Sequence, residues 1–343
     1  MANPPPPRLV AWETTRACNL TCRHCRAEAL PAPPPGELSL EEGRDLVDQL
    51  ATWAPAPGLI LSGGEPLLRP DLPDLAAYGK ARGLRVLVST NGLLLTLGLA
   101  RALRSAGVAR VSLSLDHPDP TAHDDFRGSP GSFEAVRRAA SLLVEASLPF
   151  QINSTLTKAN LDQAGALTAL TRSLGAVAHH VFLLVPVGRA TGLEPPLTAE
   201  AYEAALLDLL RREPGLEFKA TCAPQYQRLA RQAGHPSRGR GCLAGQGFLF
   251  LSSTGEAQGC GYLNLAAGNL RQTPIRTIYE ESSLFQDLRD RKRYRGRCGV
   301  CEFWSVCGGC RARARAEGDH LGPEPLCPHQ PRQAEARERR AAP

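Results

Sequence analysis

Between residues 8 and 190, short β-rich runs alternate strictly with amphipathic segments of helical periodicity. Six candidate strands cover residues 8–14, 58–63, 84–90, 110–116, 149–155 and 179–186. Helices are expected between them, for example over 39–53, where Ser39 and Glu42 have capping-box spacing, and over 132–146. Strict alternation predicts βαβ units with a parallel sheet. Right-handed crossovers would curl six such units into an α/β fold, an open, partial (β/α)6 TIM-like barrel.

Three cysteines, Cys18, Cys22 and Cys25, follow the first predicted strand in the stretch "ACNLTCRHC". Active sites of parallel α/β barrels are built at the carboxyl ends of the strands, so these thiols belong to that edge. Thiolates are the preferred ligands of iron–sulfur clusters, and three of them leave one iron of a four-iron cube open to a non-protein ligand. An incomplete zinc site is the alternative.

The whole chain has 11 cysteines, an odd number that argues against a disulfide framework. Neither a signal peptide nor a membrane-spanning apolar run is visible, which predicts a cytoplasmic protein with reduced thiols. The net charge of +6 and the aromatic content of 5% are low for a nucleic-acid binder. We therefore expect metal or redox chemistry, with no nucleic-acid or membrane partner.

The spacing C-x3-C-x2-C after a first strand, followed by "SGGEP" at 62–66, resembles the radical S-adenosylmethionine (radical SAM) superfamily. The resemblance implies a [4Fe–4S] cluster whose open iron binds S-adenosylmethionine (AdoMet) and cleaves it reductively to a 5′-deoxyadenosyl radical. It further implies that Gly63, Gly64 and Glu65 contact the methionine ammonium group. Ser114 and Asn153 are implied contacts to the AdoMet carboxylate or ribose, with plain capping or turn roles as the alternative.

Eight further cysteines lie between residues 222 and 327, and their spacing resembles the SPASM extension of radical SAM enzymes, which carries auxiliary [4Fe–4S] clusters. By that resemblance one cluster has the ligands Cys298, Cys301, Cys307 and Cys327. A second would use Cys242, Cys260 and Cys310, with Cys222 as its fourth ligand. A zinc ribbon is the alternative for the two C-x2-C pairs, and a buried free thiol or a substrate-pocket group is the alternative for Cys222.

These patterns divide the chain into five parts. A disordered N-terminus is expected over 1–8, the barrel over 9–195, a helical connector over 196–237, the SPASM-like domain over 238–330 and a mobile tail over 331–343.

The linking phrases "VPVGR" (185–189), "KATCAP" (219–224) and "CGGCRARA" (307–314) resemble the tetrapyrrole branch of the superfamily, and within it the heme b synthase family. That family decarboxylates two propionates of Fe-coproporphyrin III oxidatively to vinyl groups and needs an external low-potential electron donor, of ferredoxin or flavodoxin type. A SPASM enzyme that matures a ribosomal peptide, or one acting on a heme d1-like precursor, is the alternative. The short segment before the first strand favours a small molecule.

A tetracarboxylate substrate calls for arginine, whose planar fork matches a carboxylate. Candidates on the barrel edge are Arg16, Arg26 and Arg189. The basic runs at 289–297 and 311–315 are a further source, although a solvated face is the more ordinary interpretation. His179 and His180 start a predicted strand, so we expect them at the wrong end of the barrel to reach a porphyrin iron.

Overall fold

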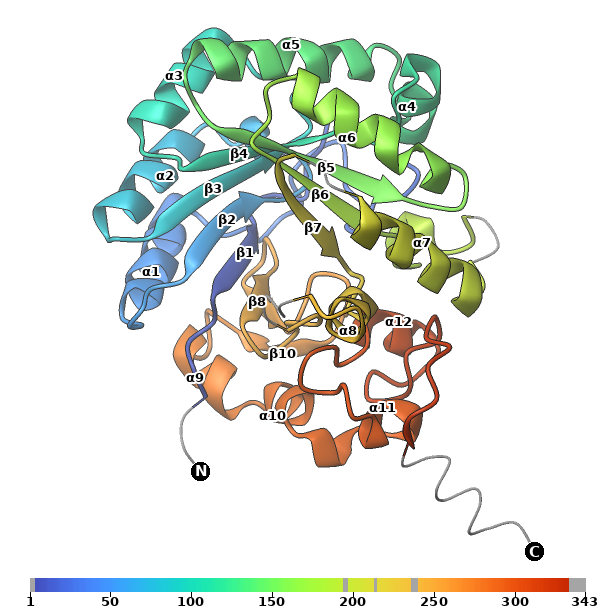
Figure 1. The fold of residues 1–343 in the computed structure, drawn as a ribbon. Coiled ribbons are helices and arrows are strands. Elements are labelled where there is room, and N and C mark those ends of the chain that lie inside the picture. The colour runs from blue at the N-terminus through green and yellow to red at the C-terminus, as the bar shows by residue number, and fades with distance from the viewer. Residues whose placement is uncertain (1–3, 194–196, 213–214, 236–239, 333–343) are drawn as a thin grey trace, which may run out of the picture.

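The computed structural model describes residues 4–193, 197–212, 215–235 and 240–332. Residues 1–3 and 333–343, which include most of the tail predicted to be mobile, lie outside the described residues. One ten-stranded sheet runs through the structure in the order β10-β9-β8-β1-β2-β3-β4-β5-β6-β7 (Figure 1).

The six predicted strands are present as parallel neighbours and curl into the predicted partial barrel. They are β1 (Leu9–Glu13), β2 (Gly58–Ser62), β3 (Arg85–Thr90), β4 (Arg110–Ser114), β5 (Phe150–Leu156) and β6 (Ala178–Leu183). The helices between them are α1 (Leu40–Ala51), α2 (Leu72–Ala81), α3 (Leu97–Ser105), α4 (Pro120–Arg127), α5 (Ser132–Glu145) and α6 (Ala164–Ser173). They cover the outer face of the barrel (Figure 1).

The outer face of the strands forms the core because alternate strand residues point toward the helices. Leu59, Leu61, Val86 and Val88 are fully buried there. The predicted capping box begins α1, with the Ser39 hydroxyl accepting from the Glu42 backbone and the Glu42 carboxylate accepting from the Ser39 backbone. Three short 3-10 turns complete the barrel, η1 (Pro66–Leu68), η2 (Leu161–Gln163) and η3 (Gly188–Ala190).

The segment predicted to be a helical connector is only partly helical. It contains α7 (Ala199–Arg211) and α8 (Gln225–Gln232), but also β7 (Glu217–Thr221), a seventh parallel strand that pairs with β6. Sequence analysis missed β7 because this five-residue edge strand has no buried residue and therefore lacks the apolar signal of the other strands.

The C-terminal region extends the same sheet on its other side. β8 (Phe248–Leu251) pairs in parallel with β1, and β9 (Glu256–Gln258) and β10 (Ala266–Asn269) follow in antiparallel pairing. The remaining elements are α9 (Ile275–Glu281), α10 (Ser283–Arg289), η4 (Arg291–Arg293), α11 (Gly296–Val300) and α12 (Arg311–Ala316). The sheet therefore continues across the predicted division near residue 237, and the five-part division remains a prediction.

Within the described residues, none of the helices combines the length and the hydropathy needed to span a membrane.

Candidate metal centres

The loop that carries Cys18, Cys22 and Cys25 leaves the carboxyl end of β1 and is closed by backbone hydrogen bonds. The Cys18 amide donates to the Leu30 carbonyl at 2.8 Å, and the Leu30 amide donates to the Arg16 carbonyl at 2.9 Å. Cys22 is buried and the other two are partly exposed. Burial raises the pKa of Cys18 to about 11. The neighbouring Cys22 and Cys25 thiols add smaller contributions in the same direction.

Gly63 and Gly64 sit where two loops meet so closely that no side chain fits. A Cβ on Gly63, whose φ is +151°, would lie 2.4 Å from the Thr15 carbonyl oxygen, and one on Gly64 would lie 2.2 Å from that of Ala17. The Gly64 and Glu65 amides donate to the Thr15 and Ala17 carbonyls at 2.7 and 2.8 Å. The turn after β2 is thereby fixed against the residues that precede Cys18.

The Glu65 carboxylate is fully buried and accepts hydrogen bonds from other residues of the protein. Its Oε1 accepts from the Thr90 hydroxyl at 2.6 Å and its Oε2 from the Asn91 amide at 2.7 Å, which ties the ends of β2 and β3 together. Burial raises the pKa of Glu65, while these hydrogen bonds oppose the rise. The predicted contact of Glu65 with the AdoMet ammonium remains a prediction.

Asn91 and Arg127 lie beside the cysteine loop, and sequence analysis did not single them out. Asn91 Nδ2 donates to Asn19 Oδ1 at 2.8 Å and lies 3.9 Å from Cys18 Sγ. Arg127 Nη1 lies 3.8 Å from Cys22 Sγ, while its Nη2 is paired with Asp116 Oδ2 at 2.6 Å. Arg127 ends α4 and Asp116 follows β4, so no short motif could reveal the pair.

The three candidate arginines all contact the cysteine loop. Arg189 donates to the carbonyls of Cys22 and Ala29 at 2.9 and 3.1 Å, and Arg16 Nη2 donates to the Ala27 carbonyl at 3.0 Å. Arg26 pairs with Glu13 at 3.2 Å and lies over the Phe250 ring at 4.5 Å, which joins the loop to β8. These side chains brace the loop, and their role toward substrate carboxylates remains a prediction.

Ser114 and Asn153 lie directly opposite each other on β4 and β5. Asn153 Oδ1 accepts from Gln151 Nε2 at 2.8 Å. His180 is the residue of β6 opposite Asn153, whereas His179 faces α6, with 2.9 Å contacts to the hydroxyls of Ser154 and Thr168. Both histidines lie among the first three residues of β6, but His180 is in register with Asn153, so their expected distance from a bound porphyrin remains a prediction.

Four cysteines of the C-terminal region line a single cavity, and they are the four predicted to bind one auxiliary cluster. They are Cys298, Cys301, Cys307 and Cys327. Burial dominates the raised pKa of Cys307, and the Cys327 and Cys298 thiols add to it.

The other four cysteines form a second group on the side of the C-terminal region that faces the barrel. Cys222 follows β7, and after burial its pKa is raised further by the thiols of Cys310, Cys260 and Cys242. Burial likewise raises the pKa of Cys260 to about 12. The structure thus brings Cys222 close to Cys242, Cys260 and Cys310, the three cysteines with which the SPASM resemblance groups it, although the metal-ligand role of every cysteine remains a prediction.

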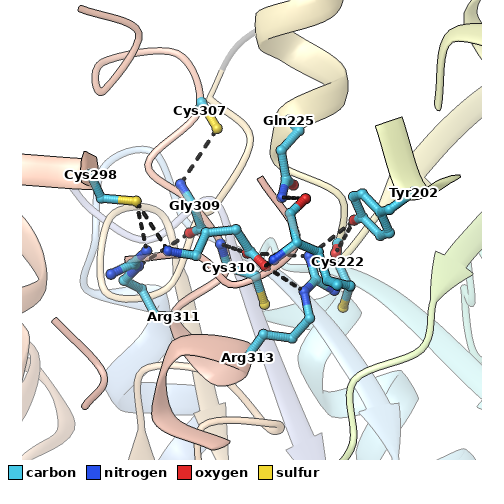
Figure 2. A network of polar contacts seen from close by, with 11 residues as sticks. Tyr202, Cys222, Gln225, Cys298, Cys307, Gly309, Cys310, Arg311 and Arg313 are labelled. Carbon is cyan, nitrogen blue, oxygen red and sulfur yellow. Dashed lines mark hydrogen bonds and ion pairs between the residues drawn. The ribbon is translucent and has the colours of Figure 1, made fainter. Parts of the chain in front are cut away.

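The interpretation of 311–315 as a solvated basic run is wrong for Arg311 and Arg313, which are 0% and 2% exposed. Arg313 forms an ion pair with the buried Glu324 at 2.9 Å and donates to the Tyr202 hydroxyl at 3.0 Å. Arg311 points toward Cys298, with Nη2 3.5 Å from its Sγ (Figure 2). A charge run in sequence carries no signal for burial, because the compensating groups come from distant positions.

The donor set suits iron–sulfur clusters. All eleven cysteines, each within the described ranges, are free, and they gather as one group of three and two groups of four. Thiolates are the ligands that such clusters prefer. Because burial raises the pKa of several of these thiols, they would be protonated without a metal ion to stabilise the thiolate.

A partial parallel barrel with three thiols after β1, braced by a double-glycine turn, is the architecture of a radical SAM enzyme. Residues 12–164 match the family model described as the radical SAM superfamily. The fold resembles that of SuiB from Streptococcus suis bound to S-adenosylmethionine, with a TM-score of 0.74, 17% identity and coverage of 94% of this chain and 77% of SuiB.

Two relatives from Methanosarcina barkeri indicate which family of radical SAM enzymes the chain belongs to. An AdoMet-dependent heme synthase is 45% identical over 341 residues, covering 95% of this chain and 97% of that protein. An Fe-coproporphyrin III synthase is 31% identical and covers 93% of this chain and 87% of that protein. The chain belongs to the heme synthase family of radical SAM enzymes, whose superfamily binds a [4Fe–4S] cluster and AdoMet.

Proposed function

We propose that this enzyme oxidatively decarboxylates two propionate side chains of Fe-coproporphyrin III to vinyl groups. The gathering of all eleven cysteines into one group of three and two groups of four carries the proposal. The 45% identity to an AdoMet-dependent heme synthase over 95% of the chain supports it.

Cys18, Cys22 and Cys25 would hold the [4Fe–4S] cluster that binds AdoMet, next to the backbone of Gly63 and Gly64. When bound, the cluster and AdoMet supply a one-electron reduction and the hydrogen abstraction that follows from it. Arg127 would place positive charge beside the Cys22 thiolate, and Asp116 holds the Arg127 guanidinium in that position. Such contacts around a ligating sulfur tune a cluster and fix its ligands.

Each propionate would lose one hydrogen atom from its β-carbon and then carbon dioxide from its carboxylate. Formation of the vinyl double bond releases one electron, so the reaction needs one electron acceptor per propionate. Cys222, Cys242, Cys260 and Cys310 would hold one auxiliary [4Fe–4S] cluster, and Cys298, Cys301, Cys307 and Cys327 another. An external low-potential donor, of ferredoxin or flavodoxin type, would supply electrons to the AdoMet-binding cluster.

Anaerobic incubation of the reconstituted enzyme with Fe-coproporphyrin III, AdoMet and a reductant, followed by mass analysis, tests this proposal. We expect a product that has lost two molecules of carbon dioxide and four hydrogen atoms. AdoMet cleavage with unchanged porphyrin would instead favour a peptide or another tetrapyrrole, such as a heme d1 precursor, as the substrate.

A further inference from the structure

We propose that Lys219, with Asn153 and Thr221, forms a carboxylate-binding subsite on the inner wall of the barrel. The inference rests on the proposed function, because the carboxylate would be a propionate of the tetrapyrrole.

The position of Lys219 follows from strand register. Asn153 of β5 is paired with His180 of β6, and His180 with Lys219 of β7. Residues in register on parallel strands point to the same face of a sheet. That face is the inner one, because the neighbouring residue of β6, His179, contacts Thr168 of α6 on the outside.

Of the titratable groups around Lys219, Glu217, Arg110 and His180 are paired with each other, and the Cys222 thiol lies three residues further along the chain. Glu217, two residues earlier on the same face, accepts from Arg110 at 3.0 Å and lies 3.5 Å from His180 Nε2. Gln151 bridges this group to Asn153, with Nε2 2.8 Å from Asn153 Oδ1 and 2.9 Å from His180 Nδ1. No carboxylate of the described residues forms an ion pair with Lys219.

The inner wall of the barrel also carries hydrogen-bond donors that have no partner among the described residues. Lys219 is an exposed residue although it faces inward. The Thr221 hydroxyl is buried and has no partner among the described residues. The amide oxygen of Asn153 accepts from Gln151, and its Nδ2 forms no hydrogen bond with another described residue. A cation flanked by unused donors suits an anion, and a carboxylate accepts several hydrogen bonds at once.

Lys219→Met, which keeps the length of the side chain but removes the charge, tests the subsite, with Lys80→Met on the outer helix α2 as the matched control. We expect Lys219→Met to weaken binding of Fe-coproporphyrin III roughly tenfold, as for loss of one charge-assisted hydrogen bond, and to leave AdoMet affinity unchanged. Lys219→Arg should retain most of the affinity, and Lys80→Met all of it.

Unchanged porphyrin affinity in Lys219→Met would overturn the subsite while leaving the proposed function intact. Weakened AdoMet binding with unchanged porphyrin affinity would also overturn it, because the carboxylate would then be that of AdoMet. If the wild-type enzyme binds no Fe-coproporphyrin III, the result contradicts the proposed function itself. Failure of the proposed function is therefore distinguishable from failure of the Lys219 subsite.

A second observation concerns Arg311 and stands independently of Lys219. We infer that Arg311 raises the reduction potential of the cluster held by Cys298, Cys301, Cys307 and Cys327. The guanidinium is 0% exposed and hydrogen-bonds to three carbonyl oxygens, those of Gly309, His320 and Gly322.

None of the ion pairs among the described residues gives Arg311 a carboxylate partner. Its neighbour Arg313 contrasts with it, because Glu324 compensates that charge at 2.9 Å. A buried guanidinium without a counter-charge is costly. Among the described residues, Arg311 hydrogen-bonds to one candidate ligand sulfur, Cys298 Sγ at 3.5 Å, so a cluster bound to this sulfur would balance its charge.

A fixed positive charge and a hydrogen bond to a ligating sulfur both stabilise the reduced cluster. We therefore expect Arg311→Met to lower the midpoint potential of this cluster, and Arg311→Lys to lower it less. The double variant Arg276→Met/Glu280→Gln, which removes an ion pair on α9 without changing the net charge, should leave it nearly unchanged.

The measurement is a potentiometric titration followed by electron paramagnetic resonance, with the signal assigned by its absence in Cys301→Ala. If Arg311→Met does not retain the cluster, Arg311→Gln keeps a donor without the charge and serves the same comparison. A potential equal to that of the wild type in the variant that lacks the charge would overturn the inference.

Discussion

Arg189 donates a hydrogen bond from Nε to the carbonyl oxygen of Cys22 at 2.9 Å. The contact joins η3, which follows the last predicted strand of the barrel, to the loop that follows the first strand, 167 residues earlier in the chain. A second bond, to the Ala29 carbonyl at 3.1 Å, fixes the same guanidinium. The cysteine loop is thus held across the barrel mouth and not only by its own turns.

Arg189→Met should therefore lower the occupancy of the AdoMet-binding cluster after reconstitution and destabilise the fold. Two lost hydrogen bonds from a charged donor to buried carbonyls correspond to about 3 kcal/mol of unfolding free energy. Iron content and chemical denaturation measure both effects. Arg101→Met, which removes an exposed ion pair with Glu145, is the control, and equal effects in the two variants would contradict the bracing role.

Gly64→Ala should disrupt the junction between the turn after β2 and the cysteine loop. The new Cβ would lie 2.2 Å from the Ala17 carbonyl oxygen, which is backbone and cannot rotate away. We expect the melting temperature to fall by several degrees and AdoMet affinity to fall with it. Gly98→Ala in α3, where the nearest atom would lie 3.9 Å away, should instead leave stability unchanged or raise it by about 0.5–1 kcal/mol.

Cys22→Ala and Cys301→Ala should remove different clusters. If three four-iron clusters are present, each variant retains about eight of about twelve irons per chain. Cys22→Ala should abolish reductive AdoMet cleavage, whereas Cys301→Ala should still bind AdoMet. Iron analysis combined with detection of 5′-deoxyadenosine separates the two results, and AdoMet cleavage that persists in Cys22→Ala would refute the ligand assignment.

His179 should make the fold less stable in mild acid. Burial, and then the neighbouring His180, lowers the pKa of His179 to about 4, below the value of about 6.5 for an unfolded chain. The stabilisation is complete above pH 6.5 and is lost as the pH falls toward 4, because the unfolded chain binds the proton first. Between pH 7 and pH 5, His179 accounts for about 2 kcal/mol of the loss.

Denaturation of His179→Leu at the two pH values tests this effect. The hydroxyls of Ser154 and Thr168 keep the carbonyls of Leu115 and Ala164 as acceptors, so the substitution strands neither of them. The variant should lose about 2 kcal/mol less than the wild type between pH 7 and pH 5. An equal loss of unfolding free energy in the two proteins would show that His179 does not titrate as described. The control is His235→Leu, which reports the effect of removing an exposed histidine.

The sequence predicted much of the barrel because its information is local. Strand and helix periodicity located β1 to β6, the pair Ser39 and Glu42 marked the start of α1, and spacing placed Cys18, Cys22 and Cys25 on one loop. β7 was missed because its apolar residues, Phe218 and Ala220, are only two and are only partly buried against the core.

Contacts between distant segments could not be read in the same way. The pair Asp116–Arg127 depends on how α4 returns to the barrel edge, and the burial of Arg311 and Arg313 depends on Glu324 and on backbone carbonyls around them. A run of arginines looks the same in sequence whether water or a folded tail surrounds it.

The central claim is that the loop after β1 holds a cluster with one iron free for AdoMet. Electron paramagnetic resonance of the reduced, oxygen-free protein, recorded with and without AdoMet, tests it most directly. We predict that AdoMet changes one cluster signal and that this signal is missing in Cys22→Ala. A wild-type spectrum that does not respond to AdoMet would contradict the account.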